Sequence, residues 1–516
     1  MGDGVSRPAI VFIGFMGAGK STAAAAAAVD AGVEALDTDV LLERQLGATI
    51  DEFFATHGEE EFRRHEQALA CELLDAAEGG AIALGGGSVL SPAVREALGR
   101  HTVVWLQVDP DVAWRRVEGA GRPLARDGAG FEALLEERLS LYESLADVIV
   151  MPSECDAVER ALPALRALAD LPAGTKMLWA ASASGEYPVV VGRGLLGAGW
   201  WPLEGRRFCV SDRVVCELYG ERIESFETRV EVEPGEATKT MAEAERVLSA
   251  LARAGMTRED HVVALGGGVV GDLAGFCAHT YQRGVPVVQV PTTLVAQVDS
   301  AYGGKTGVDL PEGKNYAGAY HLPAAVIADT ETLASLPAEE LAAGFVEVLK
   351  TGLLAGGALW ERVRGIESLD PGNLDDVVFA CARYKCEVVA ADERDAGLRQ
   401  TLNLGHTVGH AIEAASGYSR YRHGEAVGLG LLVALRLSEA PRLRDEVGEM
   451  LGRHGLPVEL DTDIGVDAIL DALQRDKKRT AAGVGFVLLS EPGAPRVGQS
   501  IDPAKVRLAV EELREK

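Results

Sequence analysis

Two stretches of this chain place a glycine-rich turn directly after an apolar run that predicts a buried strand. The first turn is GFMGAGKS, residues 14–21, which follows PAIVFIGF and leads into an alanine-rich helical segment. The second is GGGVVGD, residues 266–272, which follows HVVAL. Such turns bring backbone N–H groups and a helix N-terminus to phosphate groups. The chain is therefore expected to contain two α/β units. The first turn indicates nucleotide binding, whereas the second turn alone could also be a plain glycine connection between a strand and a helix.

Length and charge limit the other possibilities. A chain of 516 residues is too long for one ordinary core and predicts two to four domains. The net charge of −28 argues against a nucleic-acid partner or an anionic membrane surface. The seven cysteines include no CxxC pair, which favours a reducing cytoplasm. No apolar run reaches membrane-spanning length, and PAIVFIGF is better used as a strand than as a signal peptide.

The order of strand and helix patterns divides the chain. Residues 1–170 alternate strands with helices, which predicts a parallel sheet. A short Pro/Gly linker is expected at 171–175. A second α/β unit, Rossmann-like in type, is expected over 176–335, and the helical patterns that follow predict an all-helical domain over 336–516.

The first glycine turn fits the phosphate-loop pattern. Its backbone would cradle phosphates, Lys20 would reach the β and γ phosphates, and the Ser21 hydroxyl would ligate Mg²⁺. The pattern follows a strand and opens a helix, which is the context that this chemistry needs. The expected nucleotide contacts are Gly17, Ala18, Gly19, Lys20, Ser21 and Thr22.

Further motifs follow this loop in a fixed order. They are DTD (37–39), EFRRHE (61–66), GGG (85–87), GRPL (121–124) and ERLSLY (137–142). Together with the phosphate loop, this set resembles shikimate kinase over the whole of the first unit.

The resemblance implies a role for each matching residue, with ATP as co-substrate. Asp37 would lie near Mg²⁺, through water, and Asp39 would contact the hydroxyls of shikimate and accept the proton of the attacking one. Arg122 would contact ATP and stabilise the phosphate charge during transfer. The remaining shikimate contacts would be Arg63 and Arg138, which clamp the carboxylate, and Gly86.

Residues 403–425 hold three of the ten histidines of the chain. His406 and His410 are four residues apart and would share one helix face, and His423 follows a short break. Glu347, on another predicted helix, could complete a two-histidine, one-carboxylate zinc site with an open position. The alternative is an ordinary pair of surface or core histidines on an amphipathic helix.

The second half of the chain carries a longer series of motifs. They are GGGVVGD, YQRG (281–284), the segment 289–308, GKN (313–315), FVEVLK (345–350), the run 391–410, HGE (423–425) and RDKK (475–478). These motifs resemble 3-dehydroquinate synthase over residues 178–516. That family uses NAD and one metal ion, zinc or cobalt, to convert 3-deoxy-D-arabino-heptulosonate 7-phosphate to 3-dehydroquinate with release of phosphate.

The resemblance implies which residues carry this reaction. Glu347, His406 and His423 match the metal ligands, and His410 matches a substrate contact. His410 and three other residues match catalytic positions: Asp299, Lys305 and Lys350. The positions that match NAD contacts are Asp212, Gly235, Glu236, Lys239, Gly268, Val269, Val270, Gly271, Asp272, Thr292, Thr293, Lys305 and Lys314. The further substrate positions are Arg283, Asn315, Lys385, Arg399, Asn403 and one of Lys477 or Lys478.

Two further positions, Arg283 and Asp395, bear on the oligomeric state and on a departure from the family. Arg283 matches a residue that reaches the neighbouring subunit's site, which implies a homodimer. Asp395 occupies a position where the family usually has Glu, so any ion pair made there must be remade. We expect Asp395 to pair with Arg394, Lys385 or Arg399 and to support the site without touching the reacting carbons.

The sequence thus predicts a fusion of a shikimate kinase and a 3-dehydroquinate synthase, acting on small-molecule substrates. Two alternatives stay open. The second half could be another sugar-phosphate cyclase or a metal-dependent dehydrogenase, and the first half could be a non-catalytic nucleotide-sensing module.

Overall fold

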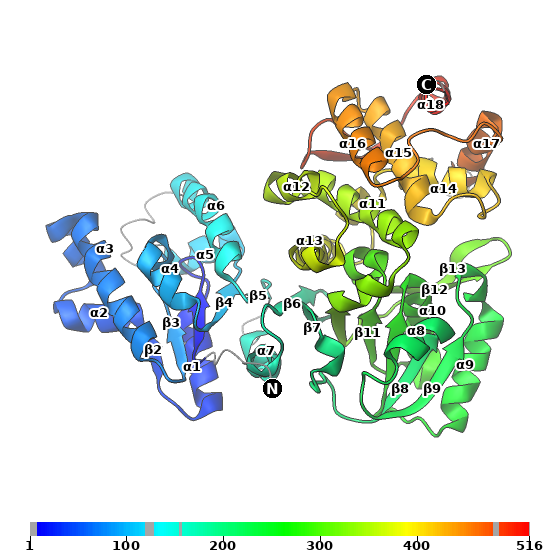
Figure 1. Cartoon of the computed structure of the whole chain (residues 1–516). Coiled ribbons are helices and arrows are strands. Elements are labelled where there is room, and N and C mark those ends of the chain that lie inside the picture. The colour runs from blue at the N-terminus through cyan, green and yellow to red at the C-terminus, as the bar shows by residue number, and fades with distance from the viewer. Residues whose placement is uncertain (1–7, 119–127, 154–156, 478–484, 515–516) are drawn as a thin grey trace. The chain divides into compact units, whose positions relative to one another are not determined.

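The computed structural model describes residues 8–118, 128–153, 157–477 and 485–514. The chain forms two compact units, residues 1–181 with 186–202 and residues 182–185 with 203–516. Figure 1 shows the first unit mainly in blue to cyan and the second in green to red. Both are α/β in type, as predicted. The strand β6 (Lys176–Ser182) pairs in parallel with β5 (Val148–Val150), so the first compact unit continues past the expected linker at 171–175.

The sheet of the first unit is parallel from β2 to β6. Its strands lie in the order β2-β3-β1-β4-β5-β6-β7. Since the chain runs from β1 outward to β2 on one side and later to β4 on the other, the order reverses at β1. Ligands of such sheets bind where the order reverses, at the carboxyl ends of the strands. The bounds are β1 (Ile10–Ile13), β2 (Ala35–Asp37), β3 (Ala81–Ala83), β4 (Thr102–Leu106) and β7 (Gly185–Gly192).

The helices of the first unit cover this sheet. The longest, α3 (Ile50–Ala76), is interrupted at Gly58, whose φ of 80° and ψ of 172° are not helical. The others are α1 (Lys20–Ala31), α2 (Thr38–Leu46), α4 (Pro92–Leu98), α5 (Pro110–Val117), α6 (Gly128–Leu145) and α7 (Ala157–Ala167), with short 3₁₀ turns η1 (Ser88–Leu90) and η2 (Leu168–Asp170).

The second unit contains a parallel sheet in the order β14-β11-β10-β8-β9. Its order reverses between β8 and β10, so the turn after β10 lies at the expected binding edge. Apolar residues of β10 and α10, among them Val262 and Leu273, are fully buried in the core beneath this edge. The strand bounds are β8 (Arg207–Asp212), β9 (Phe226–Val232), β10 (His261–Gly266), β11 (Val287–Pro291) and β14 (Ala325–Asp329). The helices are α8 (Arg213–Tyr219), α9 (Met241–Arg253) and α10 (Gly268–Thr280), with short turns η4 (Glu236–Thr238) and η5 (Tyr281–Arg283). A further short turn, η3 (Leu195–Gly197), belongs to the first unit.

A helical region follows, as predicted from residue 336. It also contains a short antiparallel pair of strands, β15 (Phe486–Leu489) and β16 (Pro495–Gln499), which the expected all-helical domain lacked. Before it come a π-helical turn η6 (Ala296–Ser300), the hairpin β12 (Lys305–Leu310) and β13 (Gly313–Tyr320), and the turn η7 (Thr330–Ser335). The helices are α11 (Ala338–Ala355), α12 (Gly357–Arg364), α13 (Asp375–Ala391), α14 (His406–Ala415), α15 (His423–Leu437), α16 (Pro441–Arg453), α17 (Val466–Lys477) and α18 (Pro503–Glu511), with turns η8 (Pro371–Asn373) and η9 (Leu398–Asn403).

Glycines let α15 approach its neighbours at backbone distance. A Cβ on Gly424 would lie 2.0 Å from the carbonyl oxygen of Ala343 in α11. A Cβ on Gly430 would lie 2.0 Å from the carbonyl oxygen of Gly405, the residue that caps α14. Only glycine fits at such contacts. The amino-terminal half of α15 is thereby held against α11 and α14, and these three helices carry the predicted metal ligands.

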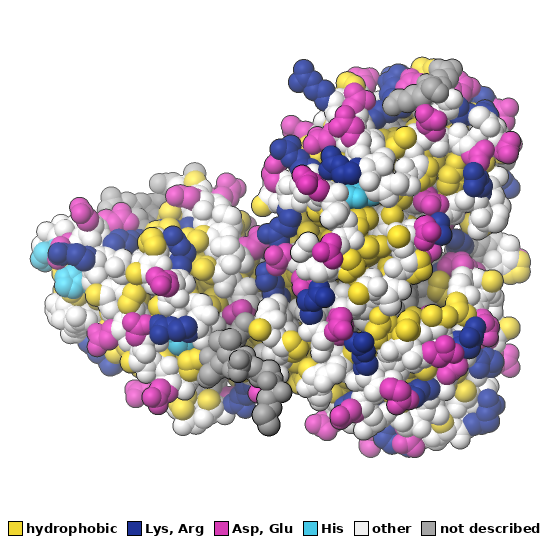
Figure 2. Space-filling model, viewed as in Figure 1, with side chains coloured by type: hydrophobic (Ala, Val, Ile, Leu, Met, Phe, Trp, Pro, Cys, Tyr) yellow, Lys and Arg dark blue, Asp and Glu magenta, His cyan; other side chains and the backbone are white. Residues whose placement is uncertain are grey.

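Among the helices of the described residues, none has both the length and the apolar character that crossing a membrane requires. On the face shown in Figure 2, acidic and basic side chains are interspersed over each unit.

Candidate active sites

The phosphate loop lies where the sequence predicts, between β1 and α1. Gly17 and Gly19 have positive φ angles of 81° and 90°, and Ser21 and Thr22 lie exposed in the first turn of α1. The Lys20 ammonium donates to the carbonyl oxygens of Gly14 and Phe15 at 3.0 and 3.1 Å. The loop therefore presents its backbone and Lys20 together at the carboxyl end of β1, with Ala18 between the two glycines.

The predicted acceptor residues gather at the ends of the neighbouring strands. Asp37 ends β2 and caps α2, because its carboxylate accepts from the N–H groups of Asp39 and Val40 at 3.0 and 3.2 Å. A Cβ on Gly85, which follows β3, would lie 2.6 Å from a carboxylate oxygen of Asp39. Asp39 thus faces the glycine turn 85–87, as a hydroxyl-binding role requires.

Arg138 and Tyr142 meet at this turn from α6. The Arg138 guanidinium and the Tyr142 hydroxyl both donate to the carbonyl oxygen of Gly86, at 3.3 and 2.6 Å. Tyr142 is fully buried, and burial raises its pKa to about 12, so it stays a neutral donor. The sequence predicted Gly86 and Arg138 but not Tyr142.

Glu66 is a second residue that the sequence analysis did not assign. Arg63 pairs with Glu66 at 2.6 Å, and the other oxygen of Glu66 accepts from the Ser88 hydroxyl at 2.9 Å. Glu66 is 4% exposed, so it fixes the guanidinium from inside the unit. The i, i+3 spacing of these two residues in EFRRHE was the available signal.

One predicted residue of this site, Arg122, lies outside the described residues. Arg116 of α5, which was not predicted, donates to the carbonyl oxygen of Gly17 at 2.9 Å and so contacts the phosphate loop.

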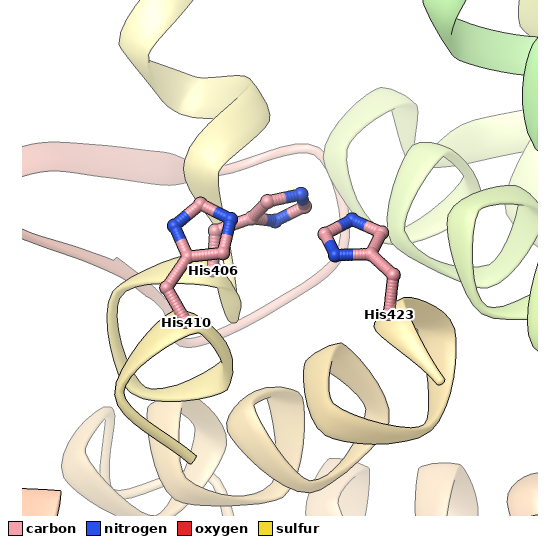
Figure 3. Close-up of side chains that lie close together, drawn as sticks. All are labelled: His406, His410 and His423. Atoms are coloured by element: carbon pink, nitrogen blue, oxygen red, sulfur yellow. The ribbon is translucent and has the colours of Figure 1, made fainter. Parts of the chain in front are cut away.

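In the second unit, His406, His410 and His423 converge (Figure 3). One ligand nitrogen from each lies within 4.8 Å of the others. The carboxylate of Glu347, from α11, completes the group: its Oε1 is 3.6 Å from Nε2 of both His406 and His423. The structure therefore brings together the three predicted ligands and the neighbouring His410.

Hydrogen bonds turn the Nε2 atoms of two histidines toward Glu347. Nδ1 of His406 lies 3.2 Å from the carbonyl oxygen of Leu404, and Nδ1 of His423 lies 3.4 Å from Oε2 of Glu413. Burial and the nearby Lys350 lower the pKa of His406 to about 3, so its imidazole is neutral. For His423 burial also acts downward, but Glu347 and Glu413 outweigh it and raise the pKa to about 9.

These residues fit a divalent cation. Glu347 is 1% exposed, and neither of its carboxylate oxygens accepts a hydrogen bond of good geometry from a described residue. Burial acts to raise the pKa of Glu347, but Lys350 and His406 lower it to about 2, so the carboxylate is ionised. A buried carboxylate beside imidazole Nε2 atoms is the donor set that zinc and cobalt prefer. That His410 contacts substrate and does not ligate the metal stays a prediction.

A chain of buried charges runs beside this cluster. The Lys350 ammonium, 1% exposed, lies 2.5 Å from Glu347 Oε2 and 2.9 Å from Asp299 Oδ2. The other oxygen of Asp299 pairs with Lys385 of α13. Asp299 and Glu347 outweigh burial and raise the pKa of Lys350, whereas burial outweighs Asp299 and lowers the pKa of Lys385. The predicted residues Asp299, Lys350 and Lys385 are thus in direct contact.

Asp395 has a different partner from those expected. It pairs with Lys305 of β12, so the expectation of Arg394, Lys385 or Arg399 is wrong. The φ angle of Asp395 is 62°, a conformation that Asp adopts more readily than Glu. The backbone thus turns the shorter side chain toward Lys305, which the sequence placed among the catalytic residues.

Arg399 and Asn403 both lie in η9. The Arg399 guanidinium is 2% exposed and donates to the carbonyl oxygens of Glu393 and Gly303 at 2.7 and 3.1 Å. Among the described residues its Nε has no hydrogen-bond partner. Asn403 is exposed at the end of the same turn.

Most of the predicted NAD residues follow three adjacent parallel strands, β8, β10 and β11, at their carboxyl ends. Asp212 ends β8 and caps α8 by accepting from Val215 N–H at 2.9 Å. Residues 268–272 form the first turn of α10 after β10, and Thr292 and Thr293 follow β11. The Thr292 hydroxyl is buried without a partner among the described residues. The side chain of Val270 is buried in the core, which leaves its backbone for a cofactor.

The charged residues among the predicted NAD contacts, Glu236, Lys239, Asp272 and Lys314, form one ion-pair cluster. Lys239 lies 3.0 Å from Glu236 and 3.2 Å from Asp272. Burial raises the pKa of Asp272 to about 6, although Lys239 opposes it. Gly235 precedes this group with a φ of 100°, and Val269 and Gly271 lie in the first turn of α10. Lys314, from β13, lies 3.9 Å from Glu236.

The remaining predicted substrate residues are Asn315, Arg283 and one of Lys477 or Lys478. Asn315 has a φ of 56° and donates its backbone N–H to Asp309 at 2.8 Å in the β12–β13 turn. Arg283 is exposed in η5, which precedes β11 and so lies at the sheet edge opposite to Thr292. The side chains of Lys477 and Lys478 lie outside the described residues.

Comparison with known proteins agrees with this arrangement. Family models match residues 16–167 as "Shikimate kinase", 229–343 as "3-dehydroquinate synthase N-terminal" and 344–479 as "3-dehydroquinate synthase C-terminal". A 3-dehydroquinate synthase from Symbiobacterium thermophilum is 44% identical over 352 residues, which cover 64% of this chain and 98% of that protein. The chain belongs to the 3-dehydroquinate synthase family. Its first unit is a shikimate kinase domain, so the chain is a fusion of the two enzymes, as the sequence predicted.

Solved structures resemble the synthase part. A 2-deoxy-scyllo-inosose synthase, complexed with carbaglucose-6-phosphate, NAD⁺ and Co²⁺, is 25% identical, covers 66% of this chain and 99% of its own, and superposes with a TM-score of 0.60. A 2-epi-5-epi-valiolone synthase from Streptomyces hygroscopicus subsp. jinggangensis 5008, with NAD⁺ and Zn²⁺ bound, is 28% identical, covers 65% and 99%, and has a TM-score of 0.59. Structural neighbours of the synthase part therefore contain NAD⁺ and a divalent metal.

Proposed function

We propose that the chain is bifunctional: it phosphorylates shikimate with ATP, and it converts 3-deoxy-D-arabino-heptulosonate 7-phosphate to 3-dehydroquinate and phosphate. The observation that carries the second activity is the convergence of Glu347, His406 and His423 beside Asp299 and Lys350, in a chain that is 44% identical to a 3-dehydroquinate synthase over 352 residues.

We propose NAD and a zinc or cobalt ion as the resident groups of the synthase, and Mg²⁺ with ATP for the kinase. When bound, NAD supplies a reversible hydride acceptor and the divalent ion supplies Lewis acidity toward substrate hydroxyls. The protein's contribution is to hold the substrate in one orientation. The metal ligands would be Glu347, His406 and His423, and the dinucleotide would lie over the turn 268–272.

Cationic side chains would hold the anionic substrate. Lys350 and Lys385 share the carboxylate of Asp299, so their ammonium groups are fixed while keeping further donors. The unpartnered Nε of buried Arg399 offers a donor for the substrate carboxylate. Since Asp299 is ionised and held between two lysines, it can accept a hydrogen bond from a substrate hydroxyl and orient it.

In the kinase, Asp39 would accept the proton of the attacking shikimate hydroxyl. Arg63, held by Glu66, and Arg138, held at Gly86, would bind the carboxylate of shikimate through planar guanidinium groups. Lys20 would exchange its two loop carbonyls for the transferred phosphate.

We also propose that the synthase works as a homodimer. Arg283 lies at the sheet edge opposite to Thr292, so it suits a role in a partner's site better than in its own. Sedimentation of the purified chain, with Arg283→Ala compared at the same concentration, tests this.

A paired assay of the purified full chain tests both activities. We expect phosphate release from the keto-acid phosphate without net NADH, and ADP formation that depends on shikimate. Lys350→Met should abolish only the first activity and Lys20→Met only the second, so each variant controls for the other. Accumulating NADH would point to a dehydrogenase, and ATP binding without shikimate-dependent ADP would point to a nucleotide-sensing module.

A further inference from the structure

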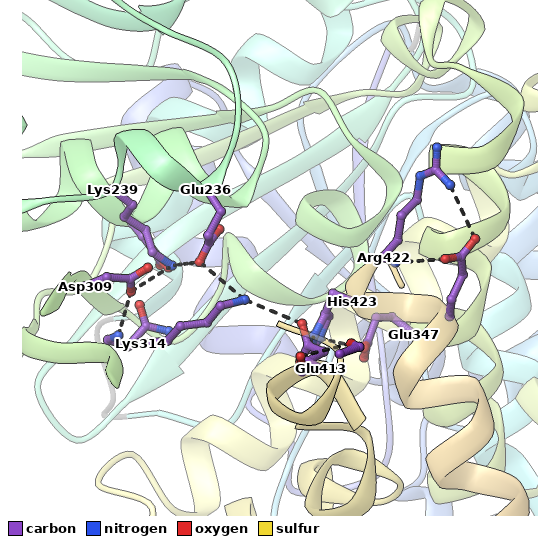
Figure 4. A network of polar contacts seen from close by, with 12 residues as sticks. Glu236, Lys239, Asp309, Lys314, Glu347, Glu413, Arg422 and His423 are labelled. Carbon is purple, nitrogen blue, oxygen red and sulfur yellow. Dashed lines mark hydrogen bonds and ion pairs between the residues drawn. The ribbon is translucent and has the colours of Figure 1, made fainter. Parts of the chain in front are cut away.

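Glu413 is a buried carboxylate between the predicted metal centre and the β12–β13 hairpin. It lies on α14, two turns beyond His406, and is 4% exposed. Its Oε2 is 3.4 Å from Nδ1 of His423, and its Oε1 is 3.5 Å from the Lys314 ammonium. Figure 4 shows the carboxylate between these two partners. Each carboxylate oxygen of Glu413 therefore contacts a different side chain, and these two contacts restrain rotation of the carboxylate.

The hairpin lysine is itself restrained. The Lys314 ammonium lies 4.7 Å from the centre of the Tyr418 ring and 3.9 Å from Glu236 Oε1. Glu236 in turn lies 3.0 Å from Lys239, so charges of alternating sign run from His423 to the 235–239 segment. Lys314 thus holds one oxygen of Glu413 in place from outside the helical region.

We propose that Glu413 is a positioning residue for the metal centre: it fixes the His423 ring with Nε2 toward Glu347, while Lys314 holds the carboxylate itself. This inference rests on the proposed function, since it assumes that His423 ligates the metal. Glu413 touches neither Glu347 nor His406 in the ion pairs described above, so it acts through His423. Second partners of ligating histidines commonly fix the ring and its tautomer, and their loss typically weakens metal affinity by about 10- to 100-fold.

A series of variants in the full chain tests the proposal. Glu413→Met fills a similar volume but removes the acceptor, and replacing a buried charged group by an apolar one of similar size is often tolerated. Glu413→Gln keeps an acceptor for Nδ1–H and should rescue most of the loss. The matched control is Glu340→Gln. Glu340 pairs with Arg422, the residue before His423, at 2.8 Å, so the control removes the same charge nearby without touching an imidazole.

Metal affinity is measured by competition of Zn²⁺ with a chromophoric chelator, and ligand geometry by the visible spectrum of the Co²⁺-loaded protein. We expect Glu413→Met to bind Zn²⁺ about 10- to 100-fold more weakly with an altered Co²⁺ spectrum. Glu340→Gln should match wild type in both. A folded Glu413→Met with wild-type affinity and spectrum would overturn the proposal. If Glu413→Met does not fold, Glu413→Ala removes the same acceptor and decides the question by the same two measurements.

Different results would refute the proposed synthase function and the proposed role of Glu413. A wild-type chain that binds no Zn²⁺ and releases no phosphate refutes the proposed synthase function. A wild-type chain that does both, with an unaffected Glu413→Met variant, refutes only the role of Glu413.

Discussion

The close contact at Gly424 gives the sharpest prediction about the metal centre. In Gly424→Ala the new methyl group would lie 2.0 Å from the carbonyl oxygen of Ala343, and a backbone oxygen cannot rotate away as a side chain can. A carbon–oxygen contact needs about 3.3 Å, so α15 must move from α11 by roughly 1.3 Å. Overpacking of this kind costs about 1–3 kcal/mol of stability.

The same displacement separates His423 from Glu347. His423 adjoins Gly424, and Glu347 lies one turn beyond Ala343 on α11, with 3.6 Å between Glu347 Oε1 and His423 Nε2. Metal–ligand distances are held to about 0.2 Å, so a shift of an ångström breaks the site. We expect Zn²⁺ affinity to fall, and phosphate release to fall on the order of a hundredfold.

Gly428→Ala on the same helix is the matched control. Its Cβ would meet Leu451 at 3.4 Å, an ordinary contact, and Ala for Gly within a helix gains about 0.5–1 kcal/mol. Thermal unfolding and chelator competition on both variants make the comparison. Gly424→Ala with wild-type affinity and stability would show that the backbone contact between α11 and α15 does not set the metal site.

Three shorter predictions concern single side chains. Asp39→Asn should abolish shikimate-dependent ADP formation while ATP binding, measured by calorimetry, survives; near-full activity would mean that another group takes the proton. His406→Ala should lose its metal, whereas His410→Ala should keep it and lose turnover, so metal analysis of the two proteins separates a ligand from a substrate contact. Asp395→Ala should raise the KM for the keto-acid phosphate by less than about tenfold, because its partner Lys305 is half exposed and such pairs contribute at most about 1 kcal/mol; a collapse of turnover at unchanged KM would place Asp395 against the reacting carbons.

Local sequence patterns predicted the strands and helices on either side of the two glycine-rich turns. The apolar runs before the two glycine turns became β1 and β10, and helices α1 and α10 begin at Lys20 and Gly268, within the two glycine-rich stretches. Strands with weaker patterns were missed: β9 is charged and partly exposed, β14 is only five residues long, and β6 begins directly after the linker expected at 171–175. Hydrophobic periodicity cannot identify such strands, because they are defined by the neighbours with which they pair.

Contacts between residues far apart in the sequence could not be predicted either. The spacing of His406 and His410 placed them on one helix face, but nothing local indicates that Glu413 lies against Lys314 99 residues away. In the same way, we expected Asp395 to pair with Arg394, Lys385 or Arg399, whereas in the structure it pairs with Lys305, 90 residues away in the sequence. The positive φ of Asp395, which decides where its carboxylate points, is set by the turn around it and leaves no pattern in the sequence.

The two hydrogen bonds from Lys20 to its own loop have a consequence for how the first unit discriminates between anions. With these bonds formed, the ammonium is already satisfied by Gly14 and Phe15, so a ligand must offer more than those carbonyls to draw it away. A lone inorganic phosphate can contact only part of the loop backbone while it competes for the lysine, whereas a nucleotide triphosphate gains contacts along the whole loop. Weakly bound anions therefore leave Lys20 bonded to its own loop, and the site binds mainly the nucleotide.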